Sequence, residues 1–148
     1  MDERAKMQAN AGPRLRLIVE SFARLAGQPL APSPALLWDA PRAVLAHGTE
    51  DPPLFFYGNQ LVLELFAMTA VQFIGLPSYQ SAEPDAREER ARMFERLETD
   101  DIVTGYGGVR IAADGTRFRI ENAIIWNLVD EAGTRHGQAA TFTDWIPV

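Results

Sequence analysis

Asn122 is the polar side chain whose surroundings most suggest chemistry. It lies in the segment GTRFRIENAIIWNLVDEAG, residues 115–133, whose alternation puts Asn122 on the same side of a strand as several large apolar residues. An amide left unpaired on an apolar face costs about 1–3 kcal/mol, so it must find a partner. The sequence leaves two interpretations open: a contact to a ligand, or a structural hydrogen bond to backbone, to Tyr57 or Tyr106, or to an ordered water.

The apolar residues on the parity of Asn122 are Phe118, Ile120, Ile124, Trp126 and Leu128. If they line a pocket together with aromatic residues of earlier segments, the pocket suits a flat or apolar molecule that few polar groups orient. A filled core explains the same spacing of aromatic residues. The candidate ligand-binding residues are Asn122, Phe56, Tyr57, Phe66, Phe73, Phe94, Tyr106, Phe118 and Trp126.

Catalytic and metal-binding patterns are absent from the sequence. It has no cysteine and no G-x-S-x-G, H-E-x-x-H or G-x-x-x-x-G-K-[ST] motif. His47 and His136 could each act as a general base, because imidazole titrates near neutrality. Each precedes a glycine at a strand end or turn, where a histidine commonly bonds backbone or faces water. We therefore predict no catalytic residue, no metal site and no enzymatic activity.

Nothing in the sequence favours phosphate or nucleic-acid binding. The GYGG run at residues 105–108 leads into a strand, whereas a phosphate-binding loop needs a helix N-terminus behind it. We interpret these glycines as a bulge or a close approach within a sheet. The formal net charge of −6 repels phosphate backbones, so no direct nucleic-acid partner is predicted.

Length, cysteine content and the N-terminus indicate the class of protein. The 148 residues suit one domain, and the lack of cysteine fits a reducing interior. Residues 1–12, MDERAKMQANAG, contain no apolar run, so neither a secretory signal nor a membrane anchor is predicted. We expect residues 1–12 to be a disordered tail and the protein to be cytoplasmic, with no membrane partner.

Hydrophobic periodicity predicts an α+β fold. Residues 13–41 comprise an amphipathic helix over 13–27 and a proline-rich connector. Next come strands at 43–48 and 53–59, helices at 59–68 (capped by Asn59), 70–77 and 81–101, and strands at 102–112, 116–129 and 135–145. We predict a five-stranded antiparallel sheet with the short helices on one face. The N-terminal helix would cover the other face and, if two copies share it, would form a homodimer.

Several phrases of the sequence resemble a known family. HGTEDPPLFFYGN, SAEPDAREERARMF and WNLVDEAGTRHGQAATF are similar to the MEKHLA domain, and the resemblance covers roughly residues 15–145. That family resembles PAS domains and occurs as small stand-alone bacterial proteins and at the C-terminus of plant class III homeodomain-leucine zipper regulators. The resemblance implies that residues 42–148 form a PAS-like domain with a cavity between the sheet and the short helices.

The resemblance also implies a class of function. PAS relatives act as sensors or dimerisation modules, so this chain is expected to sense a small molecule or to bind another protein. An apolar or aromatic ligand would occupy the cavity, and the signal would pass through a dimer or to a separate partner. Flavin photochemistry in light-sensing relatives needs a cysteine, and haem-binding relatives carry a histidine on a helix. Neither cofactor is favoured, and no other is assigned.

Two other functions stay open. One is a small isomerase or dehydratase with the cone-shaped, nuclear-transport-factor-like α+β fold, whose acid-base pair would come from His47, Tyr57, Tyr106 and Asp101. Strand order separates the folds, because two strands before the middle helices favour the PAS-like sheet and helices before the whole sheet favour the cone. The other is a structural protein with a filled core whose surface a partner recognises.

Overall fold

The computed structural model describes residues 1–82 and 84–148, with the side chains of residues 84–87 left outside that description. The start of the predicted 81–101 helix therefore lies partly outside the described residues. In chain order the elements are α1 (Glu3–Ala11), α2 (Arg14–Ala26), the 3-10 turn η1 (Pro34–Leu37), β1 (Ala43–His47), β2 (Phe55–Gly58), α3 (Gln60–Phe66), α4 (Ala70–Phe73), the 3-10 turn η2 (Ser78–Ser81), α5 (Pro84–Asp100), β3 (Ile102–Ile111), β4 (Arg117–Val129), β5 (Arg135–Phe142) and β6 (Asp144–Pro147). Two strands precede the middle helices, which is the order of the PAS-like sheet and not of the cone.

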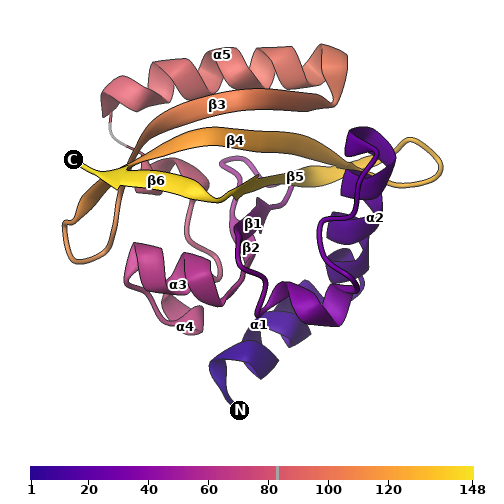
Figure 1. Cartoon of the computed structure of the whole chain (residues 1–148), viewed down its shortest axis with the longest axis horizontal. Helices are drawn as coiled ribbons and strands as arrows, with labels where there is room; N and C mark the ends of the chain where they lie inside the picture. The colour runs from indigo at the N-terminus through magenta and orange to yellow at the C-terminus, as the bar shows by residue number, and fades with distance from the viewer. Residues whose placement is uncertain (83) are drawn as a thin grey trace.

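The strands form one antiparallel sheet of six strands, in the order β2-β1-β5-β4-β3 with β6 added to β4. The prediction of five strands treated residues 135–145 as one strand, and the structure divides that stretch at Thr143. β5 pairs with the second half of β4, from Ile124 to Val129, and β6 pairs with the first half, from Phe118 to Glu121. Two short strands therefore complete one edge of the long strand β4 (Figure 1).

The helices pack on the sheet in separate groups. α5 lies along β3 and β4, and α3 lies against β1 and β2 (Figure 1). α2 packs on β4, where the Phe22 ring meets the Trp126 ring edge-on at 4.8 Å and Trp126 Nε1 donates a hydrogen bond to Ser21 Oγ at 3.0 Å. The predicted N-terminal amphipathic helix is confirmed, and it covers the sheet of its own chain.

Residues 3–11 form helix α1, so the prediction of a disordered tail over residues 1–12 is wrong there. The Asp2 side chain caps the helix by accepting from the backbone N–H of Ala5 at 2.7 Å, and the helix buries Met7 and Ala11. Asn10 Nδ2 donates to the backbone carbonyl of Phe56 on β2 at 2.8 Å. Two buried side chains four residues apart form too short an apolar pattern to predict a helix from sequence, and tertiary contacts supply the rest.

The pairing of β4 with β3 changes register at Asn122. Tyr106 pairs with Ala123 while Gly108 pairs with Ile120, so three steps along β4 span two along β3. Asn122 adopts the left-handed backbone conformation with φ 54°, and its side chain is exposed. Because side chains alternate with a period of two, the extra residue reverses the face of every residue that follows. The prediction that Asn122 stands on an apolar face of the strand is therefore wrong.

The bulge divides the apolar residues of β4 between the two faces of the sheet. Phe118, before the bulge, packs edge-on against Phe66 of α3 with ring centroids 5.3 Å apart. Trp126, after the bulge, faces α2. The residues between them that face the helices α3 and α5 are Ile120, Ala123 and Ile125, which come from both sides of the bulge. The sequence suggests that Phe118 and Trp126 lie on the same face of the strand, but the bulge at Asn122 places them on opposite faces.

We expect the effect of a substitution at Asn122 on stability to depend on how well the new residue tolerates the left-handed backbone conformation. A residue other than glycine pays about 1–2 kcal/mol for this conformation, and a β-branched residue suits it least. Asn122→Gly should keep or raise the free energy of unfolding measured in urea, and Asn122→Val should lower it by about 1–2 kcal/mol.

The matched control is Arg119, an exposed residue of the same strand with ordinary backbone geometry. There the order should reverse, because glycine weakens a regular strand and valine favours one. A valine variant more stable than the glycine variant at position 122 would contradict the bulge.

Candidate functional site

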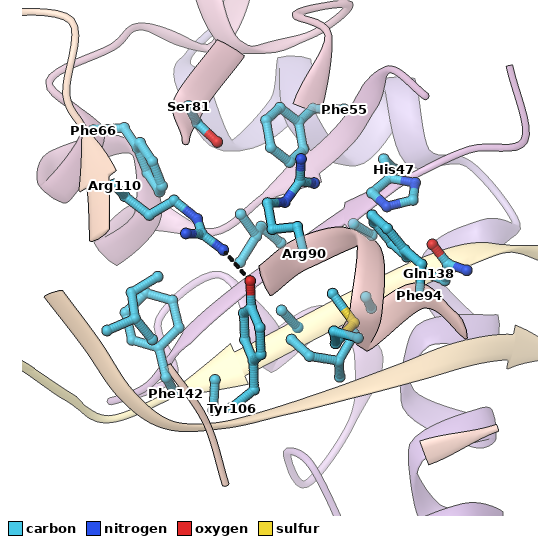
Figure 2. Close-up of a pocket in the computed structure, with 18 residues that line it drawn as sticks. His47, Phe55, Phe66, Ser81, Arg90, Phe94, Tyr106, Arg110, Gln138 and Phe142 are labelled. Atoms are coloured by element: carbon cyan, nitrogen blue, oxygen red, sulfur yellow. Dashed lines mark hydrogen bonds between the residues drawn. The ribbon is translucent and has the colours of Figure 1, made fainter. Parts of the chain in front are cut away.

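A cavity of about 60 Å³ lies between the sheet and the elements α3, η2 and α5 (Figure 2). Its apolar wall includes Leu45, Phe55, Phe66, Met93, Phe94 and Ile120. Its polar lining consists of His47, Ser81, Arg90, Tyr106, Arg110 and Gln138. Among the described residues, no aspartate or glutamate lines the cavity. The site therefore combines apolar walls with polar groups of which none is acidic.

Three of the predicted ligand-binding residues line this cavity, namely Phe66, Phe94 and Tyr106. Two others support the lining from behind. Phe118 packs on Phe66, and Phe73 stacks on Phe55 with ring centroids 4.5 Å apart. These five aromatic residues thus belong to one cluster around the cavity, although only some of them form its surface.

The other four predicted residues point elsewhere. Asn122 is exposed at the bulge, and Trp126 packs against α2. The Phe56 ring lies 3.9 Å from the guanidinium carbon of Arg14, on the side that α1 and α2 cover. Tyr57 is fully buried and is not part of the cavity lining, and its hydroxyl has no hydrogen-bond partner among the described residues. Burial raises the pKa of Tyr57 well above its usual range, so the phenol stays neutral.

Arg110 is the residue of the cavity that sequence analysis missed most clearly. It is 7% exposed, and its guanidinium donates from Nη1 to the carbonyl of Val109 at 3.0 Å and from Nη2 to the hydroxyl of Tyr106 at 3.1 Å (Figure 2). A side chain on Gly108 would place its Cβ 2.9 Å from Nη1, so glycine at this position leaves the room that the guanidinium occupies. The interpretation of the GYGG run as a site of close approach is confirmed here.

Arg90 and His47 stand on the side of the cavity near Phe94. Arg90 of α5 donates from Nη2 to Ser78 Oγ at 3.2 Å, and its guanidinium carbon lies 5.2 Å from the centre of the Phe94 ring. His47 Nδ1 lies 3.1 Å from the carbonyl oxygen of Gly48, and its ring meets Phe94 edge-on at 5.9 Å. Burial, together with the nearby charge of Arg90, lowers the pKa of His47 to about 4 despite the hydrogen bond to Gly48, so the imidazole is neutral at pH 7.

Only two of the four acid-base candidates of the enzymatic alternative line the cavity. His47 and Tyr106 line the cavity, whereas Asp101 binds Asn127 Nδ2 and Arg135 Nη2, each at 2.8 Å. His136 is exposed and pairs with Asp130 at 2.8 Å. Within residues 1–82 and 84–148, no group of three or more potential metal ligands gathers at one place.

Flavin and haem do not fit the cavity. Pockets for drug-sized molecules measure about 300–1,000 Å³, several times the cavity of about 60 Å³. The chain has no cysteine to form a flavin adduct. Both histidines lie on strands, His47 on β1 and His136 on β5, and not on a helix that faces the cavity.

The shifted pKa of His47 predicts a pH dependence of stability. The folded pKa of about 4 lies below the unfolded value near 6.5, so the neutral form is favoured by folding. This contribution is fully present above about pH 6.5 and is lost as the pH falls toward 4. It corresponds to about 3 kcal/mol in the free energy of unfolding.

Urea denaturation at several pH values measures this loss, and His47→Gln should remove it. His136→Gln is the control and should keep it, because that side chain is exposed. Hydrogen bonds lower the pKa values of three aspartates: Asp101 bonds Asn127, Asp114 bonds Thr116 and Asp130 bonds His136. These carboxyl groups therefore titrate below the pH range of 6.5 to 4 in which His47 acts. Equal slopes for wild type and His47→Gln between pH 6.5 and 4 would refute the assignment.

Known proteins resemble this chain in sequence and in fold. The MEKHLA domain family matches residues 13–147. The homeobox-leucine zipper protein HOX9 of Oryza sativa subsp. indica is 24% identical over 110 residues, which cover 74% of this chain and 13% of that protein. ATHB-9 of Arabidopsis thaliana is 23% identical over 111 residues with the same coverage, so this chain spans a small part of these relatives.

Among solved structures, the PAS domain of a protein from Colwellia psychrerythraea superimposes with a TM-score of 0.63 at 16% identity, covering 76% of this chain and 91% of that chain. A fungal LOV domain photoreceptor has a TM-score of 0.59 at 17% identity, covering 87% and 90%. The chain belongs to the MEKHLA domain family and has the fold of PAS and LOV domains.

Proposed function

We propose that this chain is a small-molecule sensor or protein-interaction module without enzymatic activity, whose ligand occupies the cavity between the sheet and α5. The observation that carries the proposal is the convergence of six polar side chains on an otherwise apolar cavity. A few convergent polar groups within apolar walls are typical of small-molecule sites. The placement of Asp101 away from the cavity supports the non-enzymatic role, because no described carboxylate lines the cavity to pair with His47.

The cavity favours a ligand smaller than the flat aromatic molecule that the sequence suggests. A dry cavity of about 150 Å³ admits benzene, whereas this cavity measures about 60 Å³. An aromatic ligand would have to displace Met93 and Phe94, which α5 contributes to the wall. A compact ligand needs no such movement.

Helix α5 is the element through which occupancy would reach a partner. Its C-terminal end is fixed, because Asn127 Nδ2 donates to the carbonyl of Leu97 at 2.8 Å and Arg135 Nη2 donates to that of Glu98 at 2.9 Å. The part nearer its N-terminus carries Arg90 and Phe94 over the cavity. A ligand that binds better to one position of this part than to another shifts the helix between them.

The output of the module would be an interaction with a second protein. The partner is either another copy, giving the homodimer suggested by the N-terminal helix, or a separate signalling protein. The plant relatives carry the matching region within much longer homeobox-leucine zipper proteins, which supports a role as one module among others. We place this role in the cytoplasm. Among the described residues, no helix is both long and apolar enough to cross a membrane.

Native mass spectrometry of freshly purified protein, followed by a thermal-shift screen of small molecules, tests this function. At a concentration about a hundred times its Kd, a ligand should raise Tm by roughly 5–10 °C. Ala123→Leu places a larger side chain in the cavity wall and should abolish that shift. Ala132→Leu, at an exposed turn, is the matched control and should keep it.

The sensing role fails if the protein retains no small molecule and no compound raises its Tm. It also fails if Ala123→Leu and wild type respond equally, since binding would then lie outside the cavity. The same mass spectrum weighs the assembly and so distinguishes a monomer from the expected homodimer.

A further inference from the structure

Arg110 is a buried charge without an acidic partner among the described residues. Arg110 takes part in none of the ion pairs of the described residues. These pairs are Lys6–Glu3, Arg16–Glu20, Arg92–Glu88, Arg135–Asp101 and His136–Asp130. Its two hydrogen bonds, to the Val109 carbonyl and the Tyr106 hydroxyl, go to neutral groups. A guanidinium has five N–H donors, so most of them have no acceptor among the described residues. Burying such a charge is costly unless a negative group pairs with it.

The surroundings hold this guanidinium in place at the cavity. Tyr106 lies four residues before Arg110 on β3, on the same side of the strand, and its hydroxyl fixes Nη2. Gly108 lies between them and leaves the space that Nη1 fills. A second guanidinium, that of Arg90, enters the lining from α5 (Figure 2). The cavity therefore presents fixed cationic donors with no acidic side chain in its described lining.

We propose that the cavity binds a small monocarboxylate with a short apolar tail, whose carboxylate pairs with Arg110. This inference rests on the proposed function and names the ligand class of the same site. The planar fork of an arginine matches the two oxygens of a carboxylate, which gives a bidentate, charge-assisted pair. The ligand supplies the negative group that no described residue places beside Arg110.

The apolar wall and the volume restrict the rest of the ligand. Phe66, Phe94 and Ile120 offer carbon surface and no donors, which suits an alkyl tail better than the further oxygens of a phosphate. A water molecule needs about 10–15 Å³ of such cavity space. The cavity of about 60 Å³ then holds a molecule of about four or five non-hydrogen atoms. Propionate, with five such atoms, is a suitable probe.

The experiment titrates propionate into the protein by isothermal calorimetry and by NMR, with propionamide as the neutral molecule of the same shape. Propionate should bind at least tenfold more tightly than propionamide. Arg110→Gln should weaken propionate binding at least tenfold and leave propionamide binding unchanged. Arg110→Lys keeps the positive charge but not the planar guanidinium, so its affinity for propionate should lie between those of wild type and Arg110→Gln. Arg119→Gln, an exposed arginine of the neighbouring strand, should bind propionate as wild type does.

Folding of the variants is checked by circular dichroism and Tm in carboxylate-free buffer. If Arg110 serves the ligand, Arg110→Gln should melt at or above the wild-type temperature there, because it removes a buried unpaired charge. A Tm more than 5 °C below wild type without carboxylate would show that Arg110 is structural and would overturn the proposal.

The remaining outcomes separate this inference from the proposed function. Equal binding of propionate and propionamide, or equal binding of inorganic phosphate, would overturn the monocarboxylate assignment. The sensing role would still stand if Ala123→Leu abolished binding of the neutral compound or of phosphate. If no compound binds in the cavity, both the monocarboxylate assignment and the sensing role are refuted.

Discussion

The change of register at Asn122 is the constraint on which both sides of this fold depend. Phe118 and Trp126 are eight residues apart, so an uninterrupted strand would turn both to the same face. The bulge turns Phe118 toward Phe66 of α3 and Trp126 toward Phe22 of α2. One long strand thereby supplies the wall of the cavity and the core beneath the N-terminal helix. The left-handed backbone of Asn122, a residue that tolerates this conformation, makes the arrangement available.

A second bulge on β3 compensates the first and brings the cavity residues together. Val103 pairs with Ile125 and Tyr106 with Ala123, so here three steps along β3 span two along β4. The extra residue lies at Thr104–Gly105, and Gly105 has a φ of 68°, which glycine adopts without strain. The two insertions cancel, and pairing resumes in register on either side. Tyr106 therefore faces the cavity, and Arg110 follows on the same side of β3.

The sequence predicted those elements whose signal is local and regular. Helix α2 has a repeating apolar stripe, and the Asn59 cap is confirmed because its side chain accepts from the backbone N–H of Val62. Asn122 was misplaced because alternation assumes a constant register, and a bulge with a non-glycine residue leaves no mark in a single sequence. The break at Thr143 lacks glycine and proline, so nothing separated β5 from β6.

The cavity arginines were missed for a related reason. An exposed ion pair is the usual expectation for an arginine met in a sequence, and the exception at Arg110 depends on which strand positions are buried. One signal was present: a pair of glycines directly precedes Val109 and Arg110 in a strand. The structure shows both as close approaches, since a Cβ on Gly107 would lie 2.9 Å from the carbonyl oxygen of Ile120 and one on Gly108 equally near Arg110 Nη1. Of the two, Gly108 is the one that leaves space for the buried guanidinium.

The charge of the whole chain and the charge of its cavity are opposite, and each governs a different kind of partner. A net charge of −6 disfavours a long polyanion, which must lie along an extended surface. Salt solution screens the surface carboxylates over about 8–10 Å, so they act only weakly on an anion inside the cavity. Arg110, in contrast, would contact such an anion directly. The low polarity of the aromatic wall strengthens that contact. Net composition therefore argues against nucleic acid without arguing against a small anion, because the local arrangement of side chains decides what an enclosed site binds.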